Sequence, residues 1–171
     1  MGHAILQAKH IITDDFFGII LADDLILSEP GCLKQLLEIH EKTQSSVLGV
    51  FSAPETQVSN YGVISSKNID GIEKVDGIVE KPKPADAPSN LAVFGRYILS
   101  KDIFLNIEQT KPGLNNEIQL TDAIQDLISN QDVFALEFEG RRFDCGSKEG
   151  YISAIIDRAL SIDKYKSIIE K

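Results

Sequence analysis

Short apolar runs recur along the chain and alternate with helix-like segments. The run FGIIL at 17–21 has the length and composition of a strand buried on both faces, and SVLGVF at 46–51 repeats this pattern. Further strands are predicted for segments 61–65, 74–80, 92–99, 133–138 and 142–144.

Helices are predicted where apolar residues return every three or four positions. One such stripe in segment 31–42 comprises Leu33, Leu36, Leu37 and His40. A second, in segment 116–128, comprises Ile118, Leu120, Ala123, Ile124, Leu127 and Ile128. Shorter helices are expected at 2–9 and 101–107, and a long closing helix at 148–167. This alternation, without an internal repeat or a low-complexity linker, predicts a single α/β domain over residues 1–171.

Composition and charge limit the partners. Hydrophobic residues make up 43% of the chain and charged residues 25%, which are globular values. The net charge of -9 argues against nucleic acid and against an anionic membrane, since both need a basic face. Cys32 and Cys145 lack metal-ligand spacing, and no signal peptide or membrane-length apolar run is visible. We therefore expect a reduced, cytoplasmic protein.

Two carboxylates come at the ends of predicted strands. Asp23 follows FGIIL, and Asp144 ends segment 142–144 just before Gly146. Ligands of open α/β sheets gather outside the carboxyl ends of strands, and carboxylates suit a hard cation. If the two share one cation, they should lie within roughly 8 Å of each other. The structural alternative is a turn residue or a helix N-cap.

The segment IVEKPKP interrupts another predicted strand. In a continuing strand Glu80 and Lys81 would face opposite sides. Pro82 ends the ladder and restricts Lys81, so the strand can twist and bring both side chains to one cleft. A salt bridge of little energetic value at the rim is the alternative.

Several segments together carry a family resemblance. VEKPKPADAPSNLAVFGRY, NEIQLTDAI and FEGRRFDCGSKEGY occur in this order, and GHAILQAK, LADDLI and NYGVI add to them. From Gly2 to the final helix the chain resembles the bacterial UTP–glucose-1-phosphate uridylyltransferases (UDP-glucose pyrophosphorylases). The resemblance implies a Rossmann-like nucleotidyltransferase fold with a mixed, mostly parallel sheet. It also implies transfer of a uridylyl group from UTP to glucose 1-phosphate, giving UDP-glucose and pyrophosphate with Mg²⁺ as cofactor.

The same resemblance implies roles for individual residues. Asp23 and Asp144 would bind the metal, and Lys81 would meet the sugar phosphate; these three are the candidate catalytic residues. Glu80 would grip the glucose hydroxyls. The remaining candidate substrate contacts are Gly2 beside the nucleotide base, Gly62, the backbone around Asn90, Ala92 and Val93, and Glu117 as a sugar-side or bracing carboxylate.

One family feature is missing from this sequence. The family carries a loop of the form G-x-G-T-R whose backbone N–H groups cradle the nucleotide phosphates, and no such motif occurs here. A smaller departure is Ala22, where many relatives have Pro or Gly. We therefore expect a C-terminal portion of the catalytic domain, incomplete at its N-terminus, that binds the sugar side and is inactive alone.

The resemblance also implies an apolar strand before this loop, which lies centrally in the sheet of the family and has no counterpart in this sequence. Its loss would leave the FGIIL strand with an unpaired apolar edge. We expect another copy in a homo-oligomer, or a bound N-terminal fragment, to cover this edge. Two alternative functions stay open at this point: a non-catalytic sugar-phosphate-binding or regulatory module, and an inactive remnant without a ligand.

Overall fold

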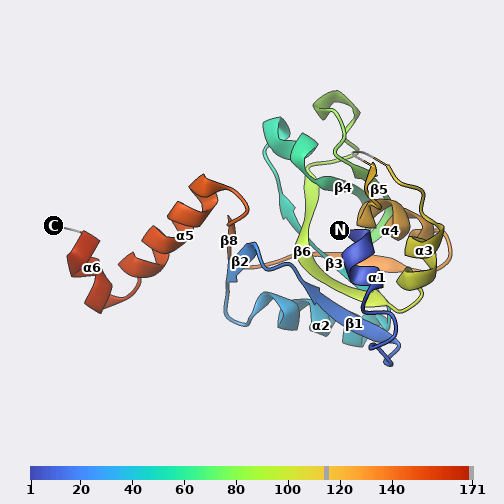
Figure 1. The fold of residues 1–171 in the computed structure, drawn as a ribbon, viewed down its shortest axis with the longest axis horizontal. Coiled ribbons are helices and arrows are strands. Elements are labelled where there is room, and N and C mark those ends of the chain that lie inside the picture. The colour runs from blue at the N-terminus through green and yellow to red at the C-terminus, as the bar shows by residue number, and fades with distance from the viewer. Residues whose placement is uncertain (114–115, 170–171) are drawn as a thin grey trace.

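The computed structural model of the protein describes residues 1–113 and 116–169 (Figure 1). The strands are β1 (Phe16–Ile20), β2 (Asp24–Leu27), β3 (Ser46–Ser52), β4 (Gly62–Ile69), β5 (Ile72–Glu80), β6 (Leu91–Ser100), β7 (Val133–Glu137) and β8 (Arg141–Asp144). The α-helices are α1 (Gly2–Leu6), α2 (Cys32–Thr43), α3 (Ile103–Gln109), α4 (Leu120–Ile128), α5 (Lys148–Leu160) and α6 (Asp163–Ile169). Short 3-10 helices span Glu55–Asn60 and Pro84–Asp86.

The described strands form one large mixed sheet and one small ladder. The large sheet has the order β1-β6-β3-β7-β5-β4, and β2 pairs with β8 apart from it. Among the strands that the structure describes, only β3 and β7 run parallel to each other in this sheet. Strand β6 is antiparallel to both β1 and β3, β5 is antiparallel to β7, and β4 and β5 form a hairpin. The expected mixed α/β sheet is confirmed, but the expectation that it is mostly parallel is wrong for the described strands.

Strand β1 lies at the edge of the large sheet. Its one partner among the described strands is β6, and Ile19 is buried whereas Ile20 is 59% exposed. The prediction that this strand is buried on both faces is therefore wrong here, because a run of apolar residues does not specify how many neighbours cover it. That another copy or an N-terminal fragment covers this edge stays a prediction.

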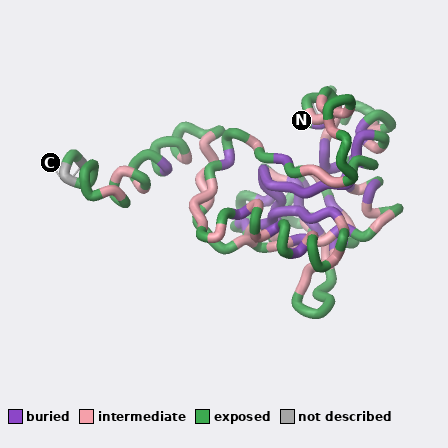
Figure 2. Tube along the Cα trace, turned by 90° about the horizontal axis from the view of Figure 1, so that it is seen from below, coloured by how far each residue is buried: buried purple, intermediate pink, exposed green. Residues whose placement is uncertain are grey.

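Side chains alternate between two cores, one on each face of the sheet. Figure 2 shows that the buried residues gather in the middle of the molecule, whereas its ends are exposed. On β3, Val47 joins the core beneath α2, and Leu48 joins the larger core beneath α3 and α4. Tyr97 and Ile98 divide in the same way on β6. This two-residue period is the pattern expected of a strand between two helical layers.

The helices differ from the predictions in their bounds and in the residues that face the core. On α2, Ile39 and not Leu37 faces the core, and Leu37 is 41% exposed. Helix α4 begins at Leu120, four positions later than segment 116–128 suggested. The predicted closing helix is two helices, α5 and α6, that extend away from the sheet (Figure 1). None of the described helices is long and apolar enough to cross a membrane.

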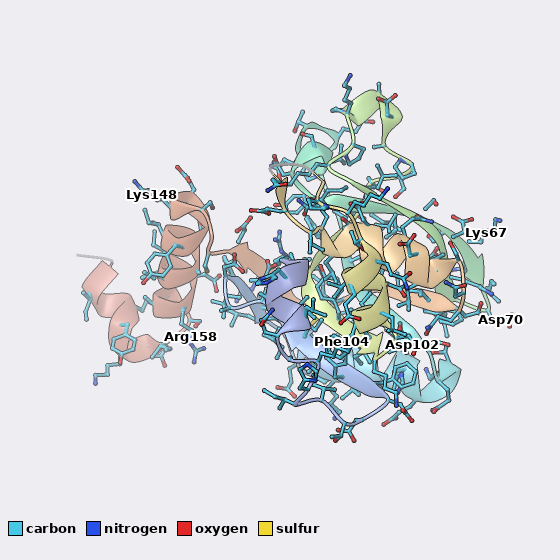
Figure 3. All side chains as sticks on the ribbon, turned by 45° about the vertical axis from the view of Figure 1, so that its right-hand side comes forward. Lys67, Asp70, Asp102, Phe104, Lys148 and Arg158 are labelled. Carbon is cyan, nitrogen blue, oxygen red and sulfur yellow. The ribbon has the colours of Figure 1, made fainter. Side chains whose placement is uncertain are left out.

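Helices α5 and α6 and the β4–β5 hairpin lie at opposite ends of the molecule (Figure 3). Figure 3 labels Lys67 and Asp70 at the hairpin end and Lys148 and Arg158 on α5. Between these two ends of the molecule, the start of β4 and the ends of β5 and β8 meet the start of α4 around a cavity.

Candidate active site

A cavity of about 300 Å³ collects most of the residues that the sequence singles out. They come from separate elements: the β1–β2 connection, the start of β4, the end of β5, the middle of β6, the approach to α4 and the end of β8. The candidate residues that line it are Asp23, Gly62, Glu80, Lys81, Val93, Glu117 and Asp144.

Three candidate residues lie outside the lining of this cavity. The N–H of Gly2 donates to the Ile118 carbonyl at 3.0 Å, and Ile118 fills the space that a side chain at residue 2 would need. Asn90 is exposed just before β6. Ala92 is fully buried beside Val63 of β4. These three residues do not line this cavity, and their expected substrate contacts stay predictions.

Asp23 and Asp144 approach each other closely. Asp23 Oδ2 and Asp144 Oδ1 both lie within 3.2 Å of the point that a Cβ on Gly146 would occupy. The carboxylates are therefore well within the roughly 8 Å expected of a pair that shares one cation. Antiparallel pairing of Asp24 with Asp144 and a 2.7 Å hydrogen bond from the Cys145 N–H to the Asp23 carbonyl fix this approach.

Asp24, the neighbour of Asp23, is held by protein groups and has a structural role. It is buried, its Oδ2 accepts the Gly95 N–H at 2.8 Å, and its Oδ1 lies 2.6 Å from Arg142 Nε. The Arg142 guanidinium stacks over the rings of Phe51 and Tyr61, at 4.6 and 5.1 Å from their centroids. Sequence reasoning missed Arg142, because its partners belong to distant segments.

The chain turns sharply at the end of β5, within the IVEKPKP segment. Lys81 has φ +45°, in the left-handed region, so the chain turns immediately after Glu80. The Lys81 N–H donates to the Tyr61 carbonyl at 3.0 Å and secures the turn. Two consecutive side chains therefore line one cavity, with Lys81 Nζ 3.9 Å from Glu80 Oε1.

Thr121 and Gly62 position Glu80. The Thr121 hydroxyl, near the start of α4, donates to Glu80 Oε2 at 2.9 Å. Gly62 pairs with Glu80 across the β4–β5 ladder. A Cβ on Gly62 would lie only 2.5 Å from Thr121 Cγ2, so the close packing leaves room for glycine alone. Thr121 was missed by sequence reasoning, although it lies inside the NEIQLTDAI segment.

The cavity carries an excess of negative charge. Among the described residues its lining includes two cationic side chains, Lys81 and Arg142, and five carboxylates, namely Asp23, Asp24, Glu80, Glu117 and Asp144. Burial lowers the pKa of Arg142, but its hydrogen bond to Tyr61 and the charge of Asp24 outweigh this, so the pKa stays above its ordinary value. Burial, with the charge of Asp24 added, raises the pKa of the Tyr97 hydroxyl well above its usual range.

The donor set fits a hard divalent cation held by few protein ligands. No group of three or more His, Cys, Asp or Glu that could hold a metal occurs among residues 1–113 and 116–169. Two adjacent carboxylates nevertheless suit Mg²⁺, which keeps several waters and commonly binds one or two carboxylates together with substrate phosphates.

The chain is similar to known nucleotidyl transferases. The model of the nucleotidyl transferase family matches residues 1–159, and the chain belongs to this family. Within it, the chain is 48% identical over 157 residues to a UTP–glucose-1-phosphate uridylyltransferase of Pseudomonas aeruginosa, covering 90% of this chain and 56% of that protein. It is 43% identical over 172 residues to UTP–glucose-1-phosphate uridylyltransferase 2 of Streptococcus pyogenes serotype M3. This match covers 97% of this chain and 58% of that protein.

Solved structures of UDP-glucose pyrophosphorylases are also similar to this chain. A UDP-glucose pyrophosphorylase complexed with UDP-glucose matches with a TM-score of 0.91 and 44% identity, covering 95% of this chain and 63% of that one. A UTP-bound UGPase from Acinetobacter baumannii matches with a TM-score of 0.84 and 35% identity. This match covers 99% of this chain and 61% of that one. These likenesses confirm the nucleotidyltransferase fold. The chain spans somewhat more than half the length of the curated relatives it matches.

Proposed function

We propose that the protein carries the sugar-phosphate and metal half of a UTP–glucose-1-phosphate uridylyltransferase site. The observation that carries this proposal is the convergence of Asp23, Asp144, Glu80 and Lys81 on one cavity. The similarity to relatives named for this activity supports it. The substrates would be glucose 1-phosphate and UTP, and the products UDP-glucose and pyrophosphate.

The chemistry that these residues can perform is positioning and charge stabilisation. The attacking group is a phosphate oxygen that is already anionic near neutral pH, so the site needs no strong general base. Asp23 and Asp144 would hold Mg²⁺, which when bound neutralises phosphate charge and orients the UTP α-phosphate. The Lys81 ammonium is a point charge for the sugar phosphate. The Glu80 carboxylate, held by Thr121, can accept hydrogen bonds from sugar hydroxyls.

The remaining parts of the proposal concern Glu117, Gly62 and the location in the cell. Glu117 and the backbone at Gly62 and Val93 complete the sugar side of the cavity. A cytoplasmic location is consistent with two free cysteines, of which Cys32 is buried.

Because the sequence has no G-x-G-T-R loop, we propose that these 171 residues bind the sugar side without forming UDP-glucose.

Calorimetric titration with UDP-glucose, with and without Mg²⁺, tests this function. We expect binding that strengthens with Mg²⁺, and loss of this strengthening in Asp23→Asn and Asp144→Asn. Asp163→Asn, an exposed change at the start of α6, is the control for charge. Mg²⁺-independent binding that survives all three changes would favour a non-catalytic sugar-phosphate module, and no binding would favour an inactive remnant.

A pyrophosphate-release assay with UTP, glucose 1-phosphate and Mg²⁺ on the same sample tests the other half of the proposal. We expect no release above background. Robust turnover would show that another part of this chain holds the UTP phosphates.

A further inference from the structure

Arg142 is an enclosed charge next to the carboxylate pair. Its side chain is 12% exposed and lies against the aromatic rings of Phe51, Tyr61 and Phe94, with Phe94 5.8 Å from the guanidinium. Its charge is paired within the protein, because Nε lies 2.6 Å from Asp24 Oδ1. Such a residue is suited to hold other groups in place and has little surface left for a substrate.

The other end of the guanidinium reaches Asp144. Arg142 Nη2 lies 3.9 Å from Asp144 Oδ2. The Tyr61 hydroxyl lies between the two side chains: it accepts from Arg142 Nη1 at 3.4 Å and donates to Asp144 Oδ2 at 3.5 Å. Asp24 anchors this chain of contacts to β6, because its second oxygen accepts the Gly95 N–H.

The two oxygens of Asp144 consequently have different neighbours. Oδ2 is directed at Arg142 and Tyr61. Oδ1 accepts the Gly146 N–H at 3.1 Å and lies on the side of Asp23. The contacts to Oδ2 therefore fix the orientation in which Oδ1 faces the partner carboxylate.

We propose that Arg142, acting through Tyr61, is a positioning residue that orients the Asp144 carboxylate toward Asp23 for binding a divalent cation. This inference rests on the cation site of the proposed function and adds a residue to it. Groups that orient a metal ligand from behind typically change metal affinity by about 10–100-fold when removed. Neither lysine nor glutamine can replace the planar fork that contacts Asp24 and Asp144 at once.

A matched pair of variants tests the inference in the 171-residue chain. Arg142→Gln and Arg141→Gln each remove one positive charge from β8, but Arg141 is exposed and forms an ion pair with Asp157 of α5 instead. Titration with Mn²⁺, followed by the paramagnetic signal of the free ion, measures cation affinity without any turnover. We expect about 10–100-fold weaker binding in Arg142→Gln and wild-type binding in Arg141→Gln.

Two further variants guard against a simple loss of folding. Arg142→Gln leaves Asp24 buried without its partner, which is strongly destabilising. The double variant Asp24→Asn/Arg142→Gln removes both charges of this buried pair. Tyr61→Phe removes only the hydroxyl and keeps the ring. We expect both variants to melt cooperatively by circular dichroism and to bind Mn²⁺ more weakly than the wild type.

The outcomes separate this inference from the proposed function. A wild-type chain that binds no Mn²⁺ would refute the cation site itself. A wild-type chain that binds Mn²⁺, with Arg142→Gln and the double variant binding equally well, would refute the positioning role alone. If Arg142→Gln weakens metal-free binding of UDP-glucose and leaves Mn²⁺ affinity unchanged, Arg142 contacts the substrate and the inference is wrong.

Discussion

Replacement of Gly62 by alanine is the sharpest test of how the cavity is built. A Cβ at this position would lie 2.5 Å from Thr121 Cγ2 and 3.0 Å from Val93 Cγ2. Both neighbours are buried side chains that branch at Cβ, so neither has a flexible end that can swing aside to make room. Carbon atoms in contact prefer about 3.5–4.0 Å, so the Thr121 methyl group must move by roughly 1 Å.

The cost of this movement follows from two contributions. Overpacking a well-filled site typically costs about 1–3 kcal/mol. Moving Thr121 also disturbs its 2.9 Å hydrogen bond to Glu80, and such a bond to a charged group contributes about 1.5–3 kcal/mol. For a chain of this size each kcal/mol lowers the melting temperature by roughly 2–4 °C. We therefore expect Gly62→Ala to melt several degrees lower and to bind glucose 1-phosphate more weakly.

Calorimetric melting and titration with glucose 1-phosphate measure the two effects. Gly31→Ala is the control, because no atom lies within 4 Å of the Cβ that it would add. Thr121→Ser, combined with Gly62→Ala, removes the clashing methyl group and keeps the hydroxyl for Glu80, so it should recover part of both losses. Equal melting and equal binding of Gly62→Ala and Gly31→Ala would refute the packing argument.

Three further predictions concern single positions. Lys81→Gly should relieve left-handed strain of about 1–2 kcal/mol and raise the melting temperature, while it weakens glucose 1-phosphate binding; a lower melting temperature would contradict this. Thr121→Val should lower the free energy of unfolding, measured in urea, by about 1–3 kcal/mol, because Glu80 loses a hydrogen-bond donor. Burial raises the pKa of Cys32 from 9.0 to about 11, so the unfolded thiol ionises first and stability should fall between pH 9 and 11, by about 1.4 kcal/mol per unit. Urea unfolding of Cys32→Ala should lack this part of the slope.

The elements that the sequence predicted best are those with an internal pattern. The apolar runs of β3 and β6 appear in the structure because strands covered on both faces are apolar almost throughout. The stripe of α4 appears because burial of one helix face imposes a fixed period. The short strand β2 was not predicted. Its four residues begin with Asp24, which looks like a turn residue, and the strand exists because β8 pairs with it. Pairing between distant segments leaves no local period to detect.

The candidate site shows the same division between local and distant information. Family-like segments indicated Asp23, Glu80, Lys81 and Asp144, and all four line one cavity. The residues that orient them lie inside the same segments, but the sequence does not show which distant side chains they contact. Thr121 contacts a residue 41 positions away, and Arg142 contacts one 118 positions away.

The turn after Glu80 depends both on a local signal, Pro82, and on a contact with a distant residue, Tyr61. Pro82 signalled that the strand ends, and the sequence alone therefore suggested that Glu80 and Lys81 could share a cleft. What places Lys81 is a left-handed backbone secured by the Tyr61 carbonyl, and the hydroxyl of the same tyrosine contacts Asp144. One residue thus joins the sugar-phosphate side of the cavity to its carboxylate side. If Tyr61→Phe weakens Mn²⁺ binding and leaves the turn intact, the effect must pass through the hydroxyl, because the carbonyl that holds Lys81 is unchanged.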